Sequence, residues 1–284
     1  MGFDFFTFGG GQFWEDVFYY QKWRIQRNYE SKQYRLLDSW DIKRHKGSFE
    51  DCRKAFLKLI EAYELPRQKG HMIIMLHGLG ETKNIFRPVW RKVMQEGFAA
   101  AAINYPSTQK HFESHVRQLE FLLNHLEDID TVSFIGKGTG AIILRELLNR
   151  ENPWKEKIRI GRIVQVCPPN KGSLWFEKLS KWKICNFLLG PMLAEMTPEK
   201  VKNIPKFAKD LDVGIIDCNF AGSKYLKYLP QKIQDRLKSG NQASISGNNQ
   251  FIKLQNHHLN VFNTRRITNA AVNFIKYGHF EEKK

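Results

Sequence analysis

From residue 70 onward the chain alternates between short apolar runs and amphipathic stretches, and this alternation constrains the fold most strongly. Residues 72–76 are continuously apolar, as expected for a parallel strand that is buried on both faces. Similar runs and intervening helical patterns occupy residues 85–96, 98–103, 115–126, 131–135, 141–148, 160–166, 213–218 and 266–277. Strands that alternate with helices of this length predict an α/β fold, with a mostly parallel, doubly wound sheet and helices on both faces.

The first 69 residues follow a different pattern and are expected to form an N-terminal extension. Two short runs, residues 23–26 and 34–37, are joined by a polar turn and predict a hairpin. Ser48 then precedes an apolar pattern of helical spacing and is expected to cap a helix that begins at Phe49. The charged stretch before Gly70 resembles a linker, so the division expected is 1–69 and 70–284.

The four cysteines are scattered, with no CxxC pair and no grouping typical of zinc. Cys167 and Cys218 fall in apolar runs, and we expect reduced thiols buried in the core, in a reducing compartment. The N-terminus has no basic region and no small-residue cleavage site, and is a poor signal peptide. No run approaches the roughly 18 apolar residues that span a bilayer. A cytoplasmic location is expected, with peripheral membrane contact left open.

A net charge of +16 has two interpretations: the protein binds an anionic partner, or the charge serves only to keep it soluble. Nucleic acid is not the expected partner, because no helix-turn-helix, RNP motif, zinc finger or arginine-rich block is visible. Anionic lipid headgroups remain a candidate. The alternative is that lysines spread along the chain simply keep it soluble.

The strand at residues 131–135 runs into Gly-Lys-Gly-Thr-Gly at positions 136–140, followed by an apolar helix. A short strand, a glycine-rich turn and a helix form the frame of a nucleophile elbow. The glycines allow a sharp turn that presents the central residue above the sheet. Here that central residue is Gly138.

Residues 134–145 resemble the elbow of bacterial lipases and esterases of the α/β-hydrolase superfamily. Residues 77–80 resemble the oxyanion loop of that family, residues 104–107 its next strand end, and residues 168–173 its Pro-Pro-Asn-x-Gly-Ser turn. Residues 256–280 are similar to its catalytic-histidine region and last helix. The resemblance implies an α/β-hydrolase fold over about residues 70–280, with a small cap insertion at about 171–210. It implies neither a metal nor a cofactor.

The resemblance also assigns roles to individual residues and shows where the pattern is broken. His258 matches the catalytic histidine as a remnant base, with His257 one residue away, while Gly138 occupies the serine position. The acid position falls at Gly240 or Asn241, and no Asp or Glu occurs between residues 236 and 280. An asparagine would not stabilise an imidazolium as a carboxylate does. A degenerate catalytic triad is therefore expected.

Oxyanion and ligand-binding roles are expected for the backbone N–H groups of Leu79 and Thr139, near a helix N-terminus, and for the positive charge of Lys137. This arrangement suits a carboxylate, phosphate or acyl group that is held without being cleaved. The alternative is a purely structural pocket. Substitute catalytic groups remain open; the candidates are Thr139, Ser133, Ser107, Asp217 and Asp235.

Residues 174–189, within the expected cap, mix aromatic residues and lysines at helical spacing. A basic amphipathic helix with tryptophans can lie on an anionic membrane surface. The alternative is that Trp175, Leu179 and Trp182 pack onto the sheet and the lysines are solvated.

Three functions are compatible with these patterns. The first is a pseudo-hydrolase that binds an acyl-bearing or anionic small molecule or a partner. The second is an active carboxylic-ester hydrolase with an unconventional nucleophile. The third is a non-enzymatic interaction protein with a basic, membrane-facing cap. The sequence leaves ligand identity and oligomeric state open.

Overall fold

The computed structural model describes residues 11–219, 243–245, 247, 249–256 and 260–281. Its larger sheet has six strands: β5 (His71–Leu76), β6 (Ala99–Ile103), β7 (Thr131–Lys137), β8 (Arg159–Val166), β9 (Val213–Asn219) and β10 (Asn249–Gln255). Their order is β10-β9-β8-β7-β5-β6, and every neighbouring pair is parallel. The predicted parallel α/β sheet is confirmed, while β10 was not anticipated.

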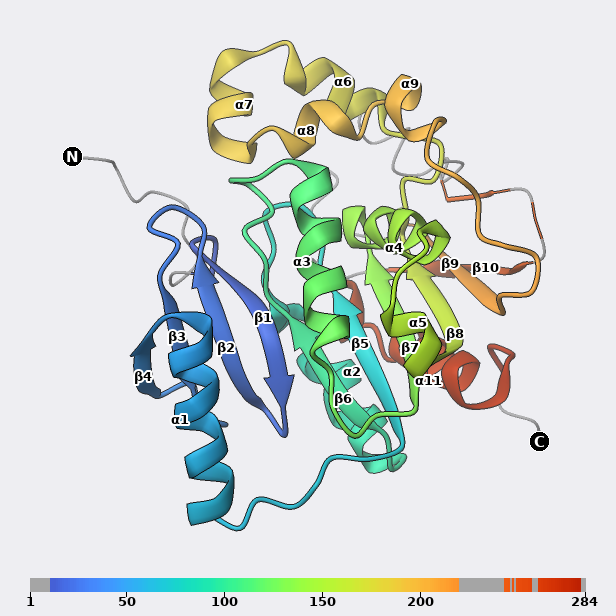
Figure 1. The fold of residues 1–284 in the computed structure, drawn as a ribbon. Coiled ribbons are helices and arrows are strands. Elements are labelled where there is room, and N and C mark those ends of the chain that lie inside the picture. The colour runs from blue at the N-terminus through green and yellow to red at the C-terminus, as the bar shows by residue number, and fades with distance from the viewer. Residues whose placement is uncertain (1–10, 220–242, 246, 248, 257–259, 282–284) are drawn as a thin grey trace.

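Helices cover both faces of this sheet, as predicted (Figure 1). The helices around it are η1 (Lys83–Phe86), α2 (Arg87–Gln95), α3 (Phe112–Asn124), α4 (Thr139–Asn149), α5 (Trp154–Lys157), η3 (Val261–Asn263) and α11 (Arg265–Tyr277). On one face, Val93 of α2 and Phe274 of α11 belong to a single buried apolar cluster. On the other, Leu119 of α3 and Leu147 of α4 belong to a second cluster. The parallel strands therefore have apolar contacts on both faces.

The N-terminal segment is more elaborate than a hairpin and a helix. It forms a four-stranded antiparallel sheet in the order β1-β2-β3-β4, packed against α1 (Phe49–Ala62). The strands are β1 (Trp14–Tyr20), β2 (Trp23–Asn28), β3 (Tyr34–Leu37) and β4 (Lys43–Gly47). Ser48 caps α1 as expected, in a reciprocal capping box with Asp51. The expected hairpin corresponds to β2 and β3, and the outer strands were not anticipated.

Strand β1 lies beside the carboxyl end of β6. The backbone N–H of Asp16 donates to the carbonyl of Asn104 at 2.9 Å, and the Asp16 carboxylate accepts from the backbone N–H of Asn104 at 2.7 Å. Tyr19 donates from its hydroxyl to the carbonyl of Ala100 at 2.8 Å. These buried bonds fix the smaller sheet against β6. Whether residues 1–69 form a separate domain remains a prediction.

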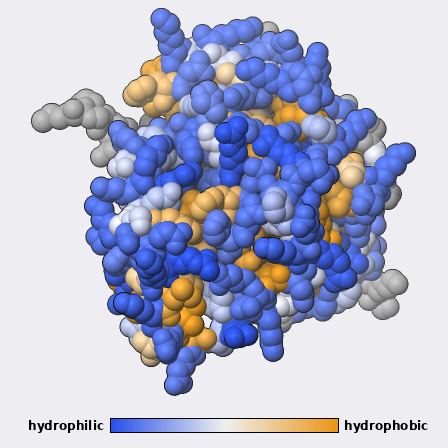
Figure 2. Space-filling model, in the orientation of Figure 1, coloured by the Kyte–Doolittle hydropathy of each residue, from blue (hydrophilic) through white to orange (hydrophobic). Residues whose placement is uncertain are grey.

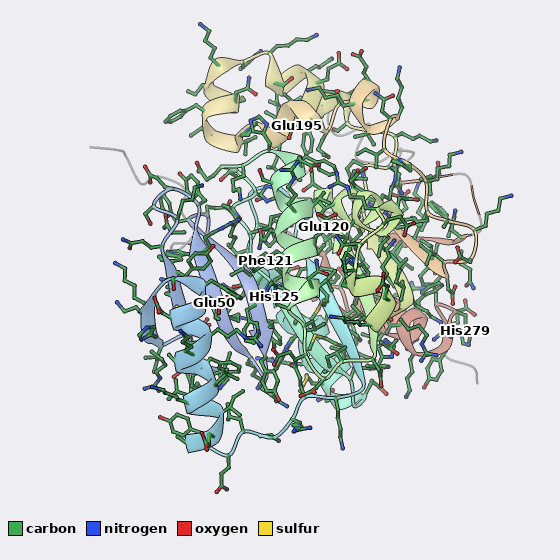
Figure 3. All side chains as sticks on the ribbon, viewed as in Figure 1. Glu50, Glu120, Phe121, His125, Glu195 and His279 are labelled. Atoms are coloured by element: carbon green, nitrogen blue, oxygen red, sulfur yellow. A yellow bond between two sulfur atoms is a disulfide. The ribbon has the colours of Figure 1, made fainter. Side chains whose placement is uncertain are left out.

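Between β8 and β9 the chain forms four short helices that we call the cap: α6 (Leu174–Ser180), α7 (Lys183–Leu189), α8 (Met192–Glu195) and α9 (Pro198–Val201). Figure 3 shows Glu195 at the underside of the cap, above the start of α3. Its carboxylate contacts His111 Nδ1 at 2.9 Å and accepts from the backbone N–H of Phe112 at 2.7 Å. Glu195 thus anchors α8 to the N-terminus of α3.

The outer cap helices expose large apolar side chains. Trp182 is 66% exposed, Ile184 65% and Phe187 82%, and α6 and α7 contain no buried residue. Figure 2 shows a mainly hydrophilic face on which hydrophobic side chains also reach the surface at the cap. The alternative that Trp182 packs onto the sheet is therefore wrong.

Cys167 and Cys218, expected as reduced thiols, are joined in a disulfide with a Cα–Cα distance of 5.2 Å. The cause is topological: Cys167 directly follows β8 and its N–H donates to the carbonyl of Ile216 in the neighbouring strand β9, at 2.8 Å. This separation is within the range that a disulfide spans. The remaining cysteines, Cys52 and Cys185, are free. Among the described residues, no helix is long and apolar enough to cross a bilayer.

Candidate functional site

The turn between β7 and α4 has the backbone of a nucleophile elbow, with Gly138 at its apex. Gly138 has φ +56° and ψ −123°, a conformation that side-chain-bearing residues rarely adopt. Its N–H donates to the carbonyl of Val166 at 3.0 Å. A Cβ built at this position would meet only the Cα of Gly78 within 4 Å among the described residues, at 3.6 Å. The apex therefore has room for a side chain that the sequence does not supply.

The flanking glycines are required by close packing. A Cβ at Gly136 would lie 2.6 Å from the Cα of Ala141, and one at Gly140 would lie 2.5 Å from the carbonyl oxygen of Leu76. Both distances are far below van der Waals contact. The outer glycines therefore allow α4 to start directly against β5 and β7, which produces the sharp turn predicted from the sequence.

The loop after β5 lies beside the apex, and two backbone N–H groups near the apex, one in this loop and one at the start of α4, have no partner among the described residues. Neither the N–H of Leu79 nor that of Thr139 donates a hydrogen bond within the part of the chain that the structure describes. The loop is held by Ser107, whose hydroxyl accepts from the N–H of Gly80 at 3.0 Å. Unpaired backbone N–H groups beside an elbow are what an oxyanion-binding site requires. Thr139 Oγ1 is also buried, with no partner in the described ranges.

Lys137, the cation expected beside the apex, is paired. Its ammonium forms an ion pair with one carboxylate oxygen of Glu81, and the other oxygen accepts from the N–H of Gly78 at 2.8 Å. Both charged side chains are largely removed from solvent. The sequence reasoning missed Glu81 because it is 56 positions from Lys137. The pair leaves the neighbourhood of the apex close to neutral.

Three buried rings contact one another beside the loop after β5, and the sequence analysis did not predict this cluster. The ring of His77 lies parallel to that of Tyr105 at 4.0 Å, and His115 contacts Tyr105 at 4.9 Å. Burial lowers the pKa of His77 to about 4 and that of His115 to about 3. His77 Nδ1 bonds to the carbonyl of Gly78 at 2.8 Å, whereas Nε2 has no partner. These histidines are neutral at physiological pH.

The other candidate nucleophiles and acids are placed differently. Ser133 is fully buried within β7, where its hydroxyl contacts His71 Nε2 at 2.8 Å and accepts from the N–H of Arg162 at 2.8 Å. The hydroxyl of Ser107 serves the loop described above. Asp217 is buried near the end of β9, and burial raises its pKa. Its Oδ2 atom has no hydrogen-bond partner among the residues that the structure describes. Asp235 lies outside the described residues.

Asn241, Gly240, His257 and His258 also lie outside the described residues. The chain before the histidines is placed: β10 ends at Gln255, and Asn256 is fully buried, with its Oδ1 accepting from the hydroxyl of Thr264 at 2.6 Å. No group of three or more His, Cys, Asp or Glu side chains that could hold a metal occurs in the described ranges.

Comparison with known proteins identifies the fold of this chain. No family model matches the chain, and no curated protein matches it. Among solved structures, the mature form of a lipase from Bacillus licheniformis aligns with a TM-score of 0.58 at 14% identity, covering 76% of this chain and 95% of the lipase. A metagenomic carboxyl esterase aligns with a TM-score of 0.53 at 14% identity, covering 68% of this chain and 67% of the esterase. The chain therefore has the α/β-hydrolase fold, as the sequence resemblance implied.

Proposed function

We propose that this α/β-hydrolase-fold protein is a pseudo-hydrolase, which binds an acyl-bearing or anionic ligand at the elbow without cleaving it. The observation that carries the proposal is Gly138 at the apex, where a nucleophilic side chain would otherwise stand. Loss of the nucleophile from a serine-protease triad lowers kcat by about 10⁶. Asn241 at the acid position, with His258 as a remnant base, would weaken the chemistry further.

The ligand class follows from the groups around the apex. The free N–H groups of Leu79 and Thr139 can donate to a carbonyl or carboxylate oxygen. Lys137 contributes little net charge because Glu81 neutralises it. We therefore favour a single acyl or carboxylate oxygen over a multiply charged anion at this position.

The alternative is an active carboxylic-ester hydrolase with an unconventional nucleophile. Thr139 offers a specific observation in its favour, since its hydroxyl is buried beside the apex and has no partner within the described part of the chain. Elbow geometry argues against it, because the residue after the apex begins α4 and its backbone N–H is the group that faces the oxyanion.

Hydrolysis of p-nitrophenyl acetate, butyrate and palmitate by the purified protein separates these functions. The pseudo-hydrolase predicts no turnover above background and no labelling by a fluorophosphonate probe. Turnover that is lost in both Thr139→Val and His258→Ala would establish the active alternative. Gly138→Ser provides the reciprocal test, because the space at the apex accommodates a Cβ.

Ligand binding is tested by displacement of a fluorescent fatty acid. Gly138→Ala is expected to weaken binding at least several-fold, since its methyl group enters the space beside Gly78. Gly97→Ala is a matched control, because Gly97 also has positive φ and no neighbour within 4 Å of an added Cβ, in the turn after α2. Fatty-acid binding that is equal in both variants would contradict a site at the apex.

The cap supports a third function, contact with an anionic membrane surface. Its exposed apolar side chains, Trp182, Ile184 and Phe187, alternate with Lys181 and Lys183. Aromatic residues and lysines on one short segment suit a lipid interface with anionic headgroups. This contact would be compatible with ligand binding at the elbow.

A cytoplasmic location, with peripheral membrane contact, also remains a proposal. It requires the Cys167–Cys218 disulfide to be reduced in cells, because disulfides are rare in reducing compartments. Alkylation of the denatured protein from freshly lysed cells tests it. Four alkylated cysteines would support a reducing compartment, and two would contradict it.

A further inference from the structure

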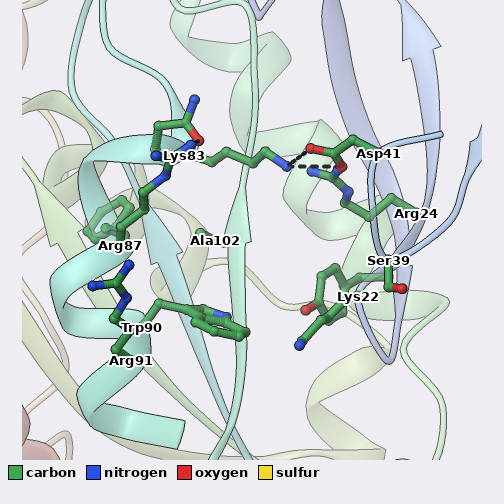
Figure 4. A pocket seen from close by; sticks show the side chains of 12 residues that line it. Lys22, Arg24, Ser39, Asp41, Lys83, Arg87, Trp90, Arg91 and Ala102 are labelled. Atoms are coloured by element: carbon green, nitrogen blue, oxygen red, sulfur yellow. Dashed lines mark hydrogen bonds and ion pairs between the residues drawn. The ribbon is translucent and has the colours of Figure 1, made fainter.

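A cleft of about 360 Å³ lies between the N-terminal sheet and helix α2 (Figure 4). Among the described residues, five cationic side chains line it against one carboxylate, that of Asp41. The cations are Lys22, Arg24, Lys83, Arg87 and Arg91. An adjoining hollow of about 400 Å³ shares Arg24, Asp41, Lys83 and Arg87 with it. Cationic groups thus converge on a concave space from both sides.

Three of these cations are four residues apart along η1 and α2: Lys83, Arg87 and Arg91. Arg87 and Arg91 are both in α2, where like charges at this spacing lie on one side of the helix and destabilise it. Arg87 is also the first residue of α2, whose first turn contains no acidic residue, so its charge opposes the helix dipole. Both effects are unfavourable for the isolated helix, and an anion bound in the cleft would reverse both.

Asp41, together with Asp16, which contacts Arg24 at 3.9 Å from outside the cleft, offsets only part of the positive charge of the cleft. Asp41 pairs with Arg24 and with Lys83, the latter at 3.0 Å. Neither Arg87 nor Arg91 has a carboxylate partner within the described part of the chain. Desolvation and the neighbouring charge of Arg24 lower the pKa of Lys83 to about 8. The cleft therefore retains excess positive charge that is partly removed from water.

An aromatic wall completes the cleft. The ammonium of Lys22 lies 4.8 Å from the centre of the Trp90 ring, and Trp90 Nε1 donates to the carbonyl of Ala100 at 3.3 Å. Figure 4 shows Trp90 on the α2 side and Arg24 with Asp41 on the opposite side. The indole is thus fixed by a backbone contact, and its face lines a cleft that also carries guanidinium groups.

We propose that this cleft binds a phosphate-bearing ligand, with Lys83, Arg87 and Arg91 as its principal contacts. Phosphate oxygens accept several charge-assisted hydrogen bonds at once, and arginine donates such bonds in a planar fork. The same chemistry is offered by a soluble phosphate compound and by the headgroup of an acidic phospholipid. The cleft is distinct from the elbow apex, because neither Gly138 nor Lys137 is among the described residues that line it.

Two binding measurements on the full chain test this proposal and separate the two sources. Calorimetric titration with inorganic pyrophosphate reports a soluble ligand, and sedimentation with phosphatidylcholine vesicles that contain phosphatidic acid reports a headgroup. In whichever measurement shows binding, Arg87→Ala combined with Arg91→Ala is expected to lower the affinity at least tenfold. Both arginines are exposed, and alanine favours a helix, so the variant should fold.

Arg265→Ala combined with Arg266→Ala is the matched control, since it removes two exposed charges from the start of α11. This control is expected to change the affinity less than twofold. Binding of the soluble ligand should also weaken as the pH rises through about 8, where Lys83 loses its proton. Equal losses of affinity in both double variants would overturn the proposal, and so would the absence of binding in both the pyrophosphate and the phosphatidic acid measurements.

Discussion

Lys137 and Glu81 form an ion pair beside the elbow apex, and Glu81 also accepts from the backbone N–H of Gly78. This carboxylate therefore holds the loop after β5 and cancels the charge of the nearest lysine. In Glu81→Gln the amide oxygen can still accept from Gly78, but Lys137 becomes uncompensated. We expect binding of a short fatty acid to strengthen about two- to tenfold and to become more sensitive to salt.

Titration of octanoate at low and high ionic strength measures this effect. Glu177→Gln, which removes one carboxylate from the cap, is the control for net charge. If Glu81→Gln changes neither the affinity for octanoate nor its salt dependence, Lys137 does not face the ligand.

The elbow glycines are expected to differ in their tolerance of alanine. Gly140→Ala places a methyl group 2.5 Å from the carbonyl oxygen of Leu76, and should destabilise the protein by about 3 kcal/mol or more. Gly138→Ala meets nothing closer than 3.6 Å, and should cost about 1–2 kcal/mol from its positive φ alone. Urea unfolding of the two variants measures the difference. Equal losses of stability would contradict the packing requirement assigned to Gly140.

The buried histidines should make the protein sensitive to acid. The folded-state pKa of His77, about 4, lies below the value near 6.5 of an unfolded histidine, so the unfolded chain binds the proton first. Stability contributed by neutral His77 is complete above about pH 6.5 and is lost as the pH falls towards 4, by roughly 3 kcal/mol. His115 acts in the same direction. Unfolding free energies between pH 7 and pH 4.5 measure the combined loss.

His115→Leu isolates one contribution to this acid sensitivity. His115 is fully buried, and neither ring nitrogen forms a well-aligned hydrogen bond with another described residue, so stability of the leucine variant at pH 7 should be unchanged or higher. The fall in stability between pH 6.5 and 4.5 should become smaller. A variant whose pH profile matches that of the original protein would rule out His115 as a source of the effect.

The disulfide is expected to make a large contribution to stability. It closes a chain segment of 51 residues, for which loop entropy predicts about 4 kcal/mol of stabilisation. Replacement of Cys167 and Cys218 by alanine should therefore lower the unfolding free energy by up to this amount. Chemical unfolding with and without a reducing agent gives a second measurement. A reductant that leaves the midpoint of the original protein unchanged would indicate that the bond is absent.

Membrane contact through the cap predicts a localised effect of substitution. Trp182→Ser combined with Phe187→Ser should reduce sedimentation with vesicles of phosphatidylcholine and phosphatidylglycerol at least tenfold, because both side chains are mostly exposed. Phe251→Ser, an exposed phenylalanine on β10, is the control. Sedimentation that does not depend on the charge of the lipid, or that decreases equally in Phe251→Ser, would contradict membrane contact through the cap.

Apolar runs and glycine-rich strand ends predicted the parallel sheet because buried strands and sharp turns leave strong local patterns. Strand β10 was missed, since its exposed and polar residues, such as Lys253, carry little of this pattern. Strand β4 is equally polar. Contacts between distant segments were not accessible either: neither the Cys167–Cys218 bond nor the Glu81–Lys137 pair has a signature in sequence spacing.

The predicted site residues had the same limits. The position of Gly138 at the elbow apex could be predicted because glycines flank it at fixed spacing. The structure has the expected sharp turn between β7 and α4 at this residue. The neutral surroundings of Lys137 could not be predicted, because Glu81, which pairs with it, belongs to the loop after β5 and is distant in the sequence. The assignments of Asn241 and His258 stay predictions.

Gly136 and Gly140 meet a demand of packing, since α4 can approach β5 only where no methyl group intervenes. Packing of α4 against the sheet therefore fixes the backbone conformation of the elbow, whether or not the apex residue is catalytic. During evolution, a nucleophile at position 138 could be lost or regained while the surrounding fold stayed intact. The same independence makes this turn a ready host for an engineered hydroxyl or thiol.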